Sequence, residues 1–418
     1  MNNSITYFKN IYSDDDDFII REIHNKKNTI YLLFFESLVD SKNVYDYIIK
    51  YIYLNNKNLN LQNLLCGPNQ KKLKSLDEVF FYIENGFTAI ICDSDIYVIE
   101  TKANIDRGIT QSTTEPNMYG PKDSLCENYQ KNLGLIKRRI KSSYLKVDSL
   151  TLGEYSKTKV SLVYMSNSLN KKTLEYYRKK ISNIKEDIID NNNILKYIER
   201  NRLFPTTLRT ERPSCISKYL LKGYLIVLID NTPFCLILDA KLKDFINPEI
   251  NDLFVKALRI ISFLLTILTP AIYISLICYN QESIPTSLLI NFMYQRFGVP
   301  FPAIIEALIM LFICEILREA DVRFPNNYGS AASILGALIL GDAAVQAGIV
   351  SPIMIIIIAI TFITNLLFTQ IKFVSAIRIL RISFLLSAAF FGLYGVALLI
   401  VLSIGYMTNI ELDEGAYL

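Results

Sequence analysis

The charged residues of this chain are very unevenly distributed, and this distribution constrains the fold more than any other feature. Residues 251–406 are strongly apolar and carry few charges, whereas most of the remaining Asp, Glu, Lys and Arg residues precede them. The whole chain of 418 residues is 51% hydrophobic, with a mean hydropathy of +0.26. Because each helical span of a bilayer needs about 20 predominantly apolar residues, we predict a polar N-terminal region followed by an α-helical, multi-span membrane domain at 251–406.

The polar region alternates between helix-like and strand-like patterns and contains a repeat. Residues 86–102 and 223–241 each begin with a Gly that follows a helical segment, continue as an apolar strand to an Asp, and return to a Lys. This pattern is typical of a β-hairpin that follows a helix capped by Gly. We therefore predict an α+β cytoplasmic region built from two small α/β modules, at residues 18–148 and 149–250.

The two ends of the chain are predicted to be short appendages. Residues 1–17 contain the acidic run Asp14–Asp17 and no signal peptide, which predicts a flexible, solvated leader and a cytoplasmic N-terminal region. Residues 407–418 are predicted to be a short, apparently truncated C-terminal tail.

Composition argues against several classes of function. The net charge is only +4 and the lysines are scattered, so no nucleic-acid partner is predicted. The seven cysteines form no CxxC pair, which indicates free thiols in a reducing compartment. His24 has no companion ligands for a metal, and Gly120-Pro121-Lys122 lacks the spacing of a phosphate-binding loop. We predict no enzymatic activity, no metal and no cofactor, since no reaction can be assigned to these residues.

The apolar region divides into candidate spans. In chain order they are 254–279, 303–319, 329–350, 349–368 and 383–406. Residues 280–302 are apolar but short, which indicates an interfacial or re-entrant helix. Counting every segment gives five spans and counting one as re-entrant gives four; the sequence leaves both open. The cluster of Lys372, Arg378 and Arg381 predicts a cytoplasmic loop before the last span.

Three acids of this region, Glu306, Glu315 and Asp342, stand where a simple membrane anchor would carry Leu or Ile, and a carboxylate there is costly unless it is paired, protonated or facing water. Glu306 and Glu315 are nine residues apart and point to opposite faces of one helix. Arg318 offers Glu315 a local ion pair at the helix end, whereas Glu306 has no cation close to it in sequence. Glu306 is therefore the stronger candidate for an ion path.

The third acid lies in a segment rich in Gly, Ala and Ser. Asp342 and Gln346 are four residues apart and share a helix face, so they are also candidates for an ion path, although a helix turn near the interface is an alternative. Gly336 and Gly341 are candidates for close helix packing, because small residues let membrane helices approach one another.

Several long motifs resemble one family. Residues 210–213 (TERP), the following LLKGYLIVLIDNTPF, and the apolar stretches GVPFPAIIEALIMLFICEILREADVRFP and GSAASILGALILGDAAVQAGIVSP resemble the GerA family of bacterial spore germination proteins, specifically the A-type subunit of a nutrient germinant receptor. The resemblance covers the chain from about residue 115 onward.

The resemblance implies a multi-pass protein of the spore inner membrane that works with a permease-like B subunit, which senses nutrients, and a lipoprotein C subunit. It implies an A subunit that forms a homo-oligomer and an ion-conducting path for monovalent cations, which triggers germination. The matching charged motifs imply structural residues that join the two modules: Gly120, Pro121, Lys122, Arg138, Arg139, Glu211, Arg212 and Pro213. Tyr119 and Lys137 stand where the family pattern has Arg.

Two other functions fit the same composition. A secondary transporter is disfavoured because the spans are few and show no inverted repeat. A non-conducting scaffold, which recruits partners through the cytoplasmic modules, is distinguished by the absence of any conductance in a bilayer.

Overall fold

The computed structural model describes residues 2–24, 29–54, 69–73, 75–92, 95–103, 121–246, 252–323, 341–412 and 415–418. It consists of two compact units. The N-terminal unit comprises Met1–Glu199 and Thr206–Ala240, and the helical unit comprises Arg200–Pro205 and Lys241–Leu418. Each unit is described on its own.

The first module of the N-terminal unit is a five-stranded antiparallel sheet in the order β1-β2-β4-β5-β3. Its strands are β1 (Phe18–His24), β2 (Thr29–Phe35), β3 (Gln70–Leu73), β4 (Phe87–Cys92) and β5 (Asp95–Glu100). Its helices are α1 (Asn2–Ile11), α2 (Ser41–Val44), a π-helix (Tyr45–Ile49), α3 (Lys50–Leu54) and α5 (Leu76–Ile83).

Apolar side chains cover both faces of this sheet. Along β2, Leu32 lies in a cluster with Ile48 of the π-helix, whereas Leu33 lies in a second cluster with Phe8 of α1 and Ile83 of α5. Successive side chains of a strand point to opposite faces, so an uninterrupted apolar strand needs a layer on each side. Helix α1 supplies part of one layer.

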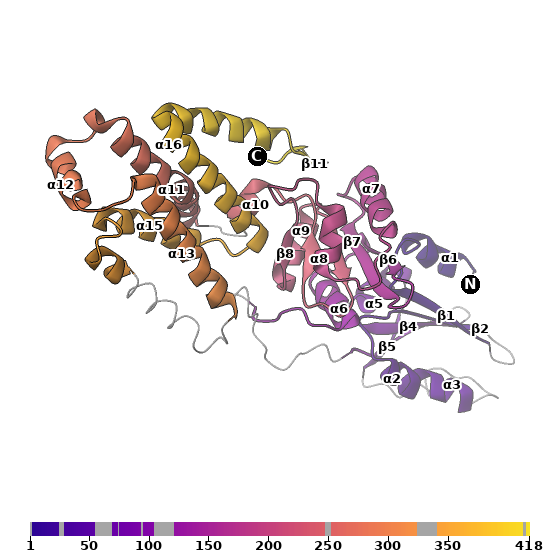
Figure 1. Ribbon diagram of the computed structural model, residues 1–418. Coiled ribbons are helices and arrows are strands. Elements are labelled where there is room, and N and C mark those ends of the chain that lie inside the picture. Colours follow the sequence, from indigo (N-terminus) through magenta and orange to yellow (C-terminus); the bar gives the residue numbers. More distant parts are fainter. Residues whose placement is uncertain are drawn as a thin grey trace. The chain divides into compact units, whose positions relative to one another are not determined.

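The second module has the same topology. Its order β6-β7-β9-β10-β8 repeats the first order strand for strand, and all its pairs are antiparallel. The strands are β6 (Leu145–Leu152), β7 (Thr158–Met165), β8 (Leu208–Thr210), β9 (Ile226–Ile229) and β10 (Cys235–Ile237). The helices are α6 (Tyr129–Arg139), α7 (Lys171–Ser182), α8 (Asn191–Ile198) and α9 (Pro213–Leu221), all visible in Figure 1.

Both predicted hairpins are confirmed. Gly86, after α5, has φ +81° and precedes the β4–β5 pair, and Gly223, after α9, has φ +90° and precedes the β9–β10 pair. A helix often ends at a residue with positive φ, and glycine adopts this conformation with less strain than any other residue type.

The predicted boundary between the two modules is wrong. It falls between residues 148 and 149, inside β6. The segment before α6 already belongs to the second module, since the Leu125 amide donates to the Glu211 carbonyl over 2.7 Å. The local pattern of the hairpins located the centre of each module but carried no information about where its first strand begins.

The helical unit contains α10 (Leu242–Ile246), α11 (Leu253–Cys278), α12 (Thr286–Arg296), α13 (Ala303–Arg323), α15 (Pro352–Asn365) and α16 (Ile371–Thr408). Within the described residues, α11 and α16 are long and apolar enough to cross a membrane, with mean hydropathies of 2.3 and 2.4, and α15 is a shorter apolar helix. Helix α11 matches the first predicted span, and α12 is a short helix in the segment predicted to be interfacial.

The predicted loop before the last span is not a loop. Helix α16 begins at Ile371, so Lys372, Arg378 and Arg381 all lie within its first three turns. Helix α16 is interrupted at Gly392, where φ is 59° and ψ is −145°, and its two arms meet at a bend in Figure 1. The Tyr279 hydroxyl donates to the carbonyls of Ala389 and Phe390 over 2.7 and 3.1 Å. These two carbonyls next to the break therefore accept a hydrogen bond from a side chain.

The C-terminal residues pack within the helical unit. Strands β11 (Glu411–Leu412) and β12 (Gly415–Ala416) form a small antiparallel pair. Tyr417 is fully buried, and its carbonyl accepts a hydrogen bond from the Leu242 amide over 2.8 Å.

Candidate functional site

Glu306, in the first turn of α13, has a side chain that is 0% exposed and fully engaged. One carboxylate oxygen lies 3.3 Å from Arg296 Nη2 at the end of α12. The other accepts from the Ser351 amide over 3.0 Å and from the Ser351 hydroxyl over 2.8 Å. The expectation that Glu306 has no nearby cation is therefore wrong, because Arg296 is brought to it across the turn between α12 and α13.

The position of Ser351 explains why an acid is stable here. Ser351 is the N-cap of α15, and its own side chain makes no capping hydrogen bond to that helix. Glu306 instead places a negative charge at the helix N-terminus, where free amides and the helix dipole favour an anion. The carboxylate thus holds α12, α13 and the start of α15 together.

Glu315 is paired with a different helix. Its carboxylate lies 2.7 Å from Arg378 Nη2 and 2.9 Å from Arg381 Nη2, both on α16. The Arg381 side chain is only 4% exposed. The expected local ion pair with Arg318 is not the one formed, although Arg318 does lie close to the same cluster. Because nine residues complete about two and a half helical turns, the two acids lie on opposite faces of α13, and each face is linked to a different set of helices.

Asp342 and Gln346 do share a helix face. Gln346 donates to the Asp342 carboxylate over 2.7 Å, and both side chains are exposed. A Cβ added at Gly341 would meet no atom within 4 Å, so nothing in the described chain packs against it. Gly336 lies outside the described residues. Within the described part, no hydrogen bond or ion pair joins Glu306 to Asp342, so the predicted ion-path residues do not form one cluster in a single chain.

The charged motifs of the N-terminal unit lie mainly within the second module. Arg139 forms an ion pair with Asp123, and Glu211 is buried with its carbonyl bound to Leu125. Arg212 is the N-cap residue of α9, and Pro213 is in its first turn, where a missing amide hydrogen costs nothing. Pro121 and Lys122 are exposed, as is Arg138, while Gly120 lies outside the described residues.

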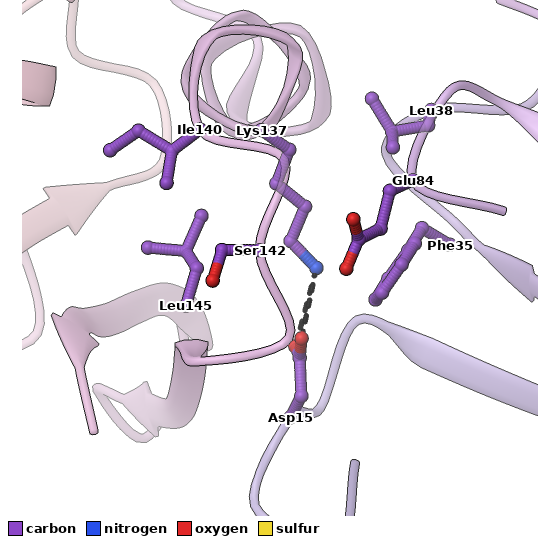
Figure 2. A pocket seen from close by; sticks show the side chains of 8 residues that line it. All are labelled: Asp15, Phe35, Leu38, Glu84, Lys137, Ile140, Ser142 and Leu145. Carbon is purple, nitrogen blue, oxygen red and sulfur yellow. Dashed lines mark hydrogen bonds and ion pairs between the residues drawn. The ribbon is translucent and has the colours of Figure 1, made fainter. Parts of the chain in front are cut away.

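Lys137, which was not among the predicted site residues, is one of the residues that join the two modules. Its ammonium lies 3.1 Å from the Asp15 carboxylate, 2.8 Å from that of Asp17, and 3.8 Å from the centre of the Phe35 ring. The Lys137 side chain is only 5% exposed. Figure 2 shows it reaching from α6 toward Asp15, with Phe35 and Glu84 beside it.

The same contacts overturn the predicted leader. Asp15 and Asp17 are buried, and Asp17 also accepts hydrogen bonds from the amide and hydroxyl of Ser37 over 3.0 and 2.6 Å. Asp14 and Asp16 are exposed on the alternate positions. Residues 2–17 are therefore a structured part of the first module.

The electrostatics of this cluster reflect burial. Burial raises the pKa of the Asp15 carboxyl above its usual range, although Lys137 opposes the shift. Burial likewise raises the pKa of Glu84, which accepts a 3.2 Å hydrogen bond from the Tyr12 hydroxyl. No group of three or more metal-ligating side chains is present in the part of the chain that the structure describes.

Comparison with known proteins decides the family. The model of the Bacillus/Clostridium GerA spore germination protein family matches residues 6–418. The chain belongs to this family. Spore germination protein KA of Bacillus subtilis (strain 168), a GerA relative, is 32% identical over 431 residues, covering 98% of this chain and 79% of that protein. Spore germination protein GerQA of Bacillus cereus is 30% identical over 417 residues, covering 96% and 84%.

A solved structure is also similar. The N-terminal domain of the A subunit of the Bacillus megaterium spore germinant receptor GerK3 covers 57% of this chain and 94% of that one, with 23% identity and a TM-score of 0.45. The GerA resemblance seen in the sequence motifs is confirmed by the family match and by the A-type relatives.

Proposed function

We propose that this GerA-family chain is the membrane A subunit of a spore germinant receptor, and that it forms or gates a path for monovalent cations as a homo-oligomer. Nutrients would be sensed by a permease-like B subunit, with a lipoprotein C subunit completing the receptor. The chain would lie in the spore inner membrane, with its N-terminal unit in the cytoplasm. Its role would be to switch conformation rather than to catalyse a reaction.

The observation that carries this proposal is the different environment of the acids in the helical unit. Glu306 and Glu315 are paired inside the chain, whereas Asp342 is exposed and, among the residues that the structure describes, has a hydrogen bond from Gln346 and no ion pair. An exposed carboxylate in otherwise apolar sequence favours a water-filled lumen, and an acidic lumen favours cations. We therefore assign Asp342 and Gln346 to the path itself and Glu306 to the support of its walls.

The remaining surface of the helical unit supports a membrane location. The second arm of α16 exposes large apolar side chains at helical spacing: Tyr394, Leu398, Val401 and Leu402. Such a stripe suits lipid or the helices of a neighbouring subunit. The stripe therefore supports both membrane insertion and assembly of subunits. It does not distinguish lipid from a neighbouring subunit as the surface that contacts it.

Ion selectivity in a planar bilayer tests the proposal. The purified full-length chain is reconstituted, and the cation-to-anion permeability ratio is compared for the unmodified chain, Asp342→Asn and the control Glu282→Gln, which neutralises an exposed acid of the same unit. We expect cation-selective conductance that Asp342→Asn reduces and Glu282→Gln leaves unchanged. Absence of any conductance in the assembled oligomer would contradict the path and favour a scaffold.

A further inference from the structure

A small cavity lies between three helices of the helical unit. It has a volume of about 10 Å³ and is lined by residues of α13, α15 and α16. The polar side chains that line it are Glu315, Arg318, Asn365 and Arg381. A space of this size is just large enough for one water molecule.

Two polar atoms at this cavity have no hydrogen-bond partner within the protein. Arg381 Nε is a donor and Asn365 Oδ1 is an acceptor, and both residues are 3% exposed. A third atom, Glu315 Oε2, is in ion-pair contact with Arg378 yet receives no hydrogen bond. An unpartnered buried polar atom costs about 1–3 kcal/mol, so an unpartnered donor and an unpartnered acceptor at one cavity call for a ligand that both donates and accepts.

We propose that a single ordered water molecule binds in this cavity between Arg381, Asn365 and Glu315. Its oxygen accepts from Arg381 Nε, and its two protons are donated to Asn365 Oδ1 and Glu315 Oε2. The water then makes three hydrogen bonds, one with each of the three side-chain atoms. This number lies within the range of about two to four that buried waters make. Water fits better than an inorganic anion, because two acceptors, Asn365 Oδ1 and the Glu315 carboxylate, lie beside the two arginines that line the cavity.

The cavity of the N-terminal unit shown in Figure 2 provides a comparison. It also measures about 10 Å³ and is lined by charged residues, among them Asp15, Glu84 and Lys137. There the carboxylates and the ammonium are hydrogen-bonded to one another or to neighbouring side chains, and none of these three residues has a buried atom without a partner. Cavity size alone therefore does not lead to the proposal; the unpartnered donor of Arg381 and the unpartnered acceptor of Asn365 do.

The water would give Asn365 a positioning role. Through it, α15 is linked to the ion pair that fastens α13 to α16, so the pair becomes a three-helix junction. Asn365 touches neither the proposed ion path nor the Glu306 cluster in any described contact, so the water site can be tested separately from the proposed function.

A structure of the full chain in lipid nanodiscs, at a resolution that shows ordered water, tests the proposal directly. We expect a density peak within about 2.7–3.2 Å of both Arg381 Nε and Asn365 Oδ1. Asn365→Leu should abolish the peak and lower the unfolding temperature. The control Ile358→Val enlarges the same cavity without removing a polar atom, and it should retain the peak.

Three results would overturn the assignment. The first is a direct hydrogen bond between Arg381 and Asn365 with no intervening density. The second is a density peak at the site that becomes stronger when bromide replaces chloride, which would identify an anion. The third is an unfolding temperature for Asn365→Leu that is no lower than that for Ile358→Val. None of these outcomes bears on whether the oligomer conducts cations.

Discussion

Removal of the Glu306 carboxylate is the sharpest perturbation of the helical unit. Glu306→Ala leaves Arg296 without its counter-charge and leaves two donors of Ser351 without an acceptor, all at a position where the carboxylate is fully buried. Removing one partner of a buried ion pair typically costs about 3–5 kcal/mol. Glu306→Gln keeps an oxygen that can accept from Ser351, so we expect a smaller loss of about 1–3 kcal/mol.

The assay is equilibrium unfolding of the purified chain in detergent, followed by the loss of helical circular dichroism. A double-mutant cycle with Arg296→Gln isolates the pair, and we expect a coupling of about 0.5–3 kcal/mol. Glu282→Gln is the matched control, since substitutions of exposed residues usually change stability by less than about 0.5 kcal/mol. If Glu306→Ala is as stable as Glu282→Gln, or if the coupling vanishes, the carboxylate does not hold these helices together.

Three further changes test other parts of the account. Lys137→Met leaves Asp15 and Asp17 buried without a cation, and it should destabilise the N-terminal unit by about 3–5 kcal/mol in thermal unfolding; wild-type stability would contradict the inter-module role. Tyr279→Phe removes the donor at the break in α16 and should cost about 1–3 kcal/mol by the same measurement, whereas no loss would mean that the two carbonyls find another donor. The pKa of Glu84 is raised by burial, so the folded state binds more protons than the unfolded state just above pH 4.5, and stability falls as pH rises through this window. Glu84→Gln should flatten that fall in unfolding curves measured across pH, and an unchanged slope would assign it to another group.

Much of the N-terminal fold could be predicted because its signals are local. The two hairpins were found from a glycine, an apolar run and a turn within about twenty residues of sequence, and the structure adds that the two sheets share one strand order. The burial of Asp15 and Asp17 was missed, because four consecutive acids are typical of a solvated segment and only long-range contacts reveal the alternation.

Lys137 carried a signal that could have been used. It lies four residues after Leu133 and three before Ile140, on the buried face of α6, whereas Arg138 points to solvent. A helical projection would have separated the two basic residues. It would not have identified the partner of Lys137, since Asp15 is 122 residues away in the sequence.

The ion pairs of the helical unit show the same limit. The sequence correctly placed Glu306 and Glu315 on opposite faces of a helix, because that follows from the helical repeat alone. Their partners depend on which helices pack together: Arg381 is 66 residues from Glu315, and it lies in a segment whose charges predicted a loop. The cost of a carboxylate in apolar sequence identified Glu306, Glu315 and Asp342 as the important acids. Which of them stays exposed depends on how the helices pack, and the sequence alone did not show this.

Germinant-triggered cation release from spores tests the central claim most directly. Spores carrying the unmodified chain, Asp342→Asn or the control Glu282→Gln are exposed to nutrient, and potassium release is followed with an ion-selective electrode, with the amount of the chain in the spore membrane measured in parallel. We expect Asp342→Asn to slow release at unchanged protein level, while Glu282→Gln behaves like the unmodified chain. Equal release rates in all three strains would contradict the assignment of Asp342 to the ion path.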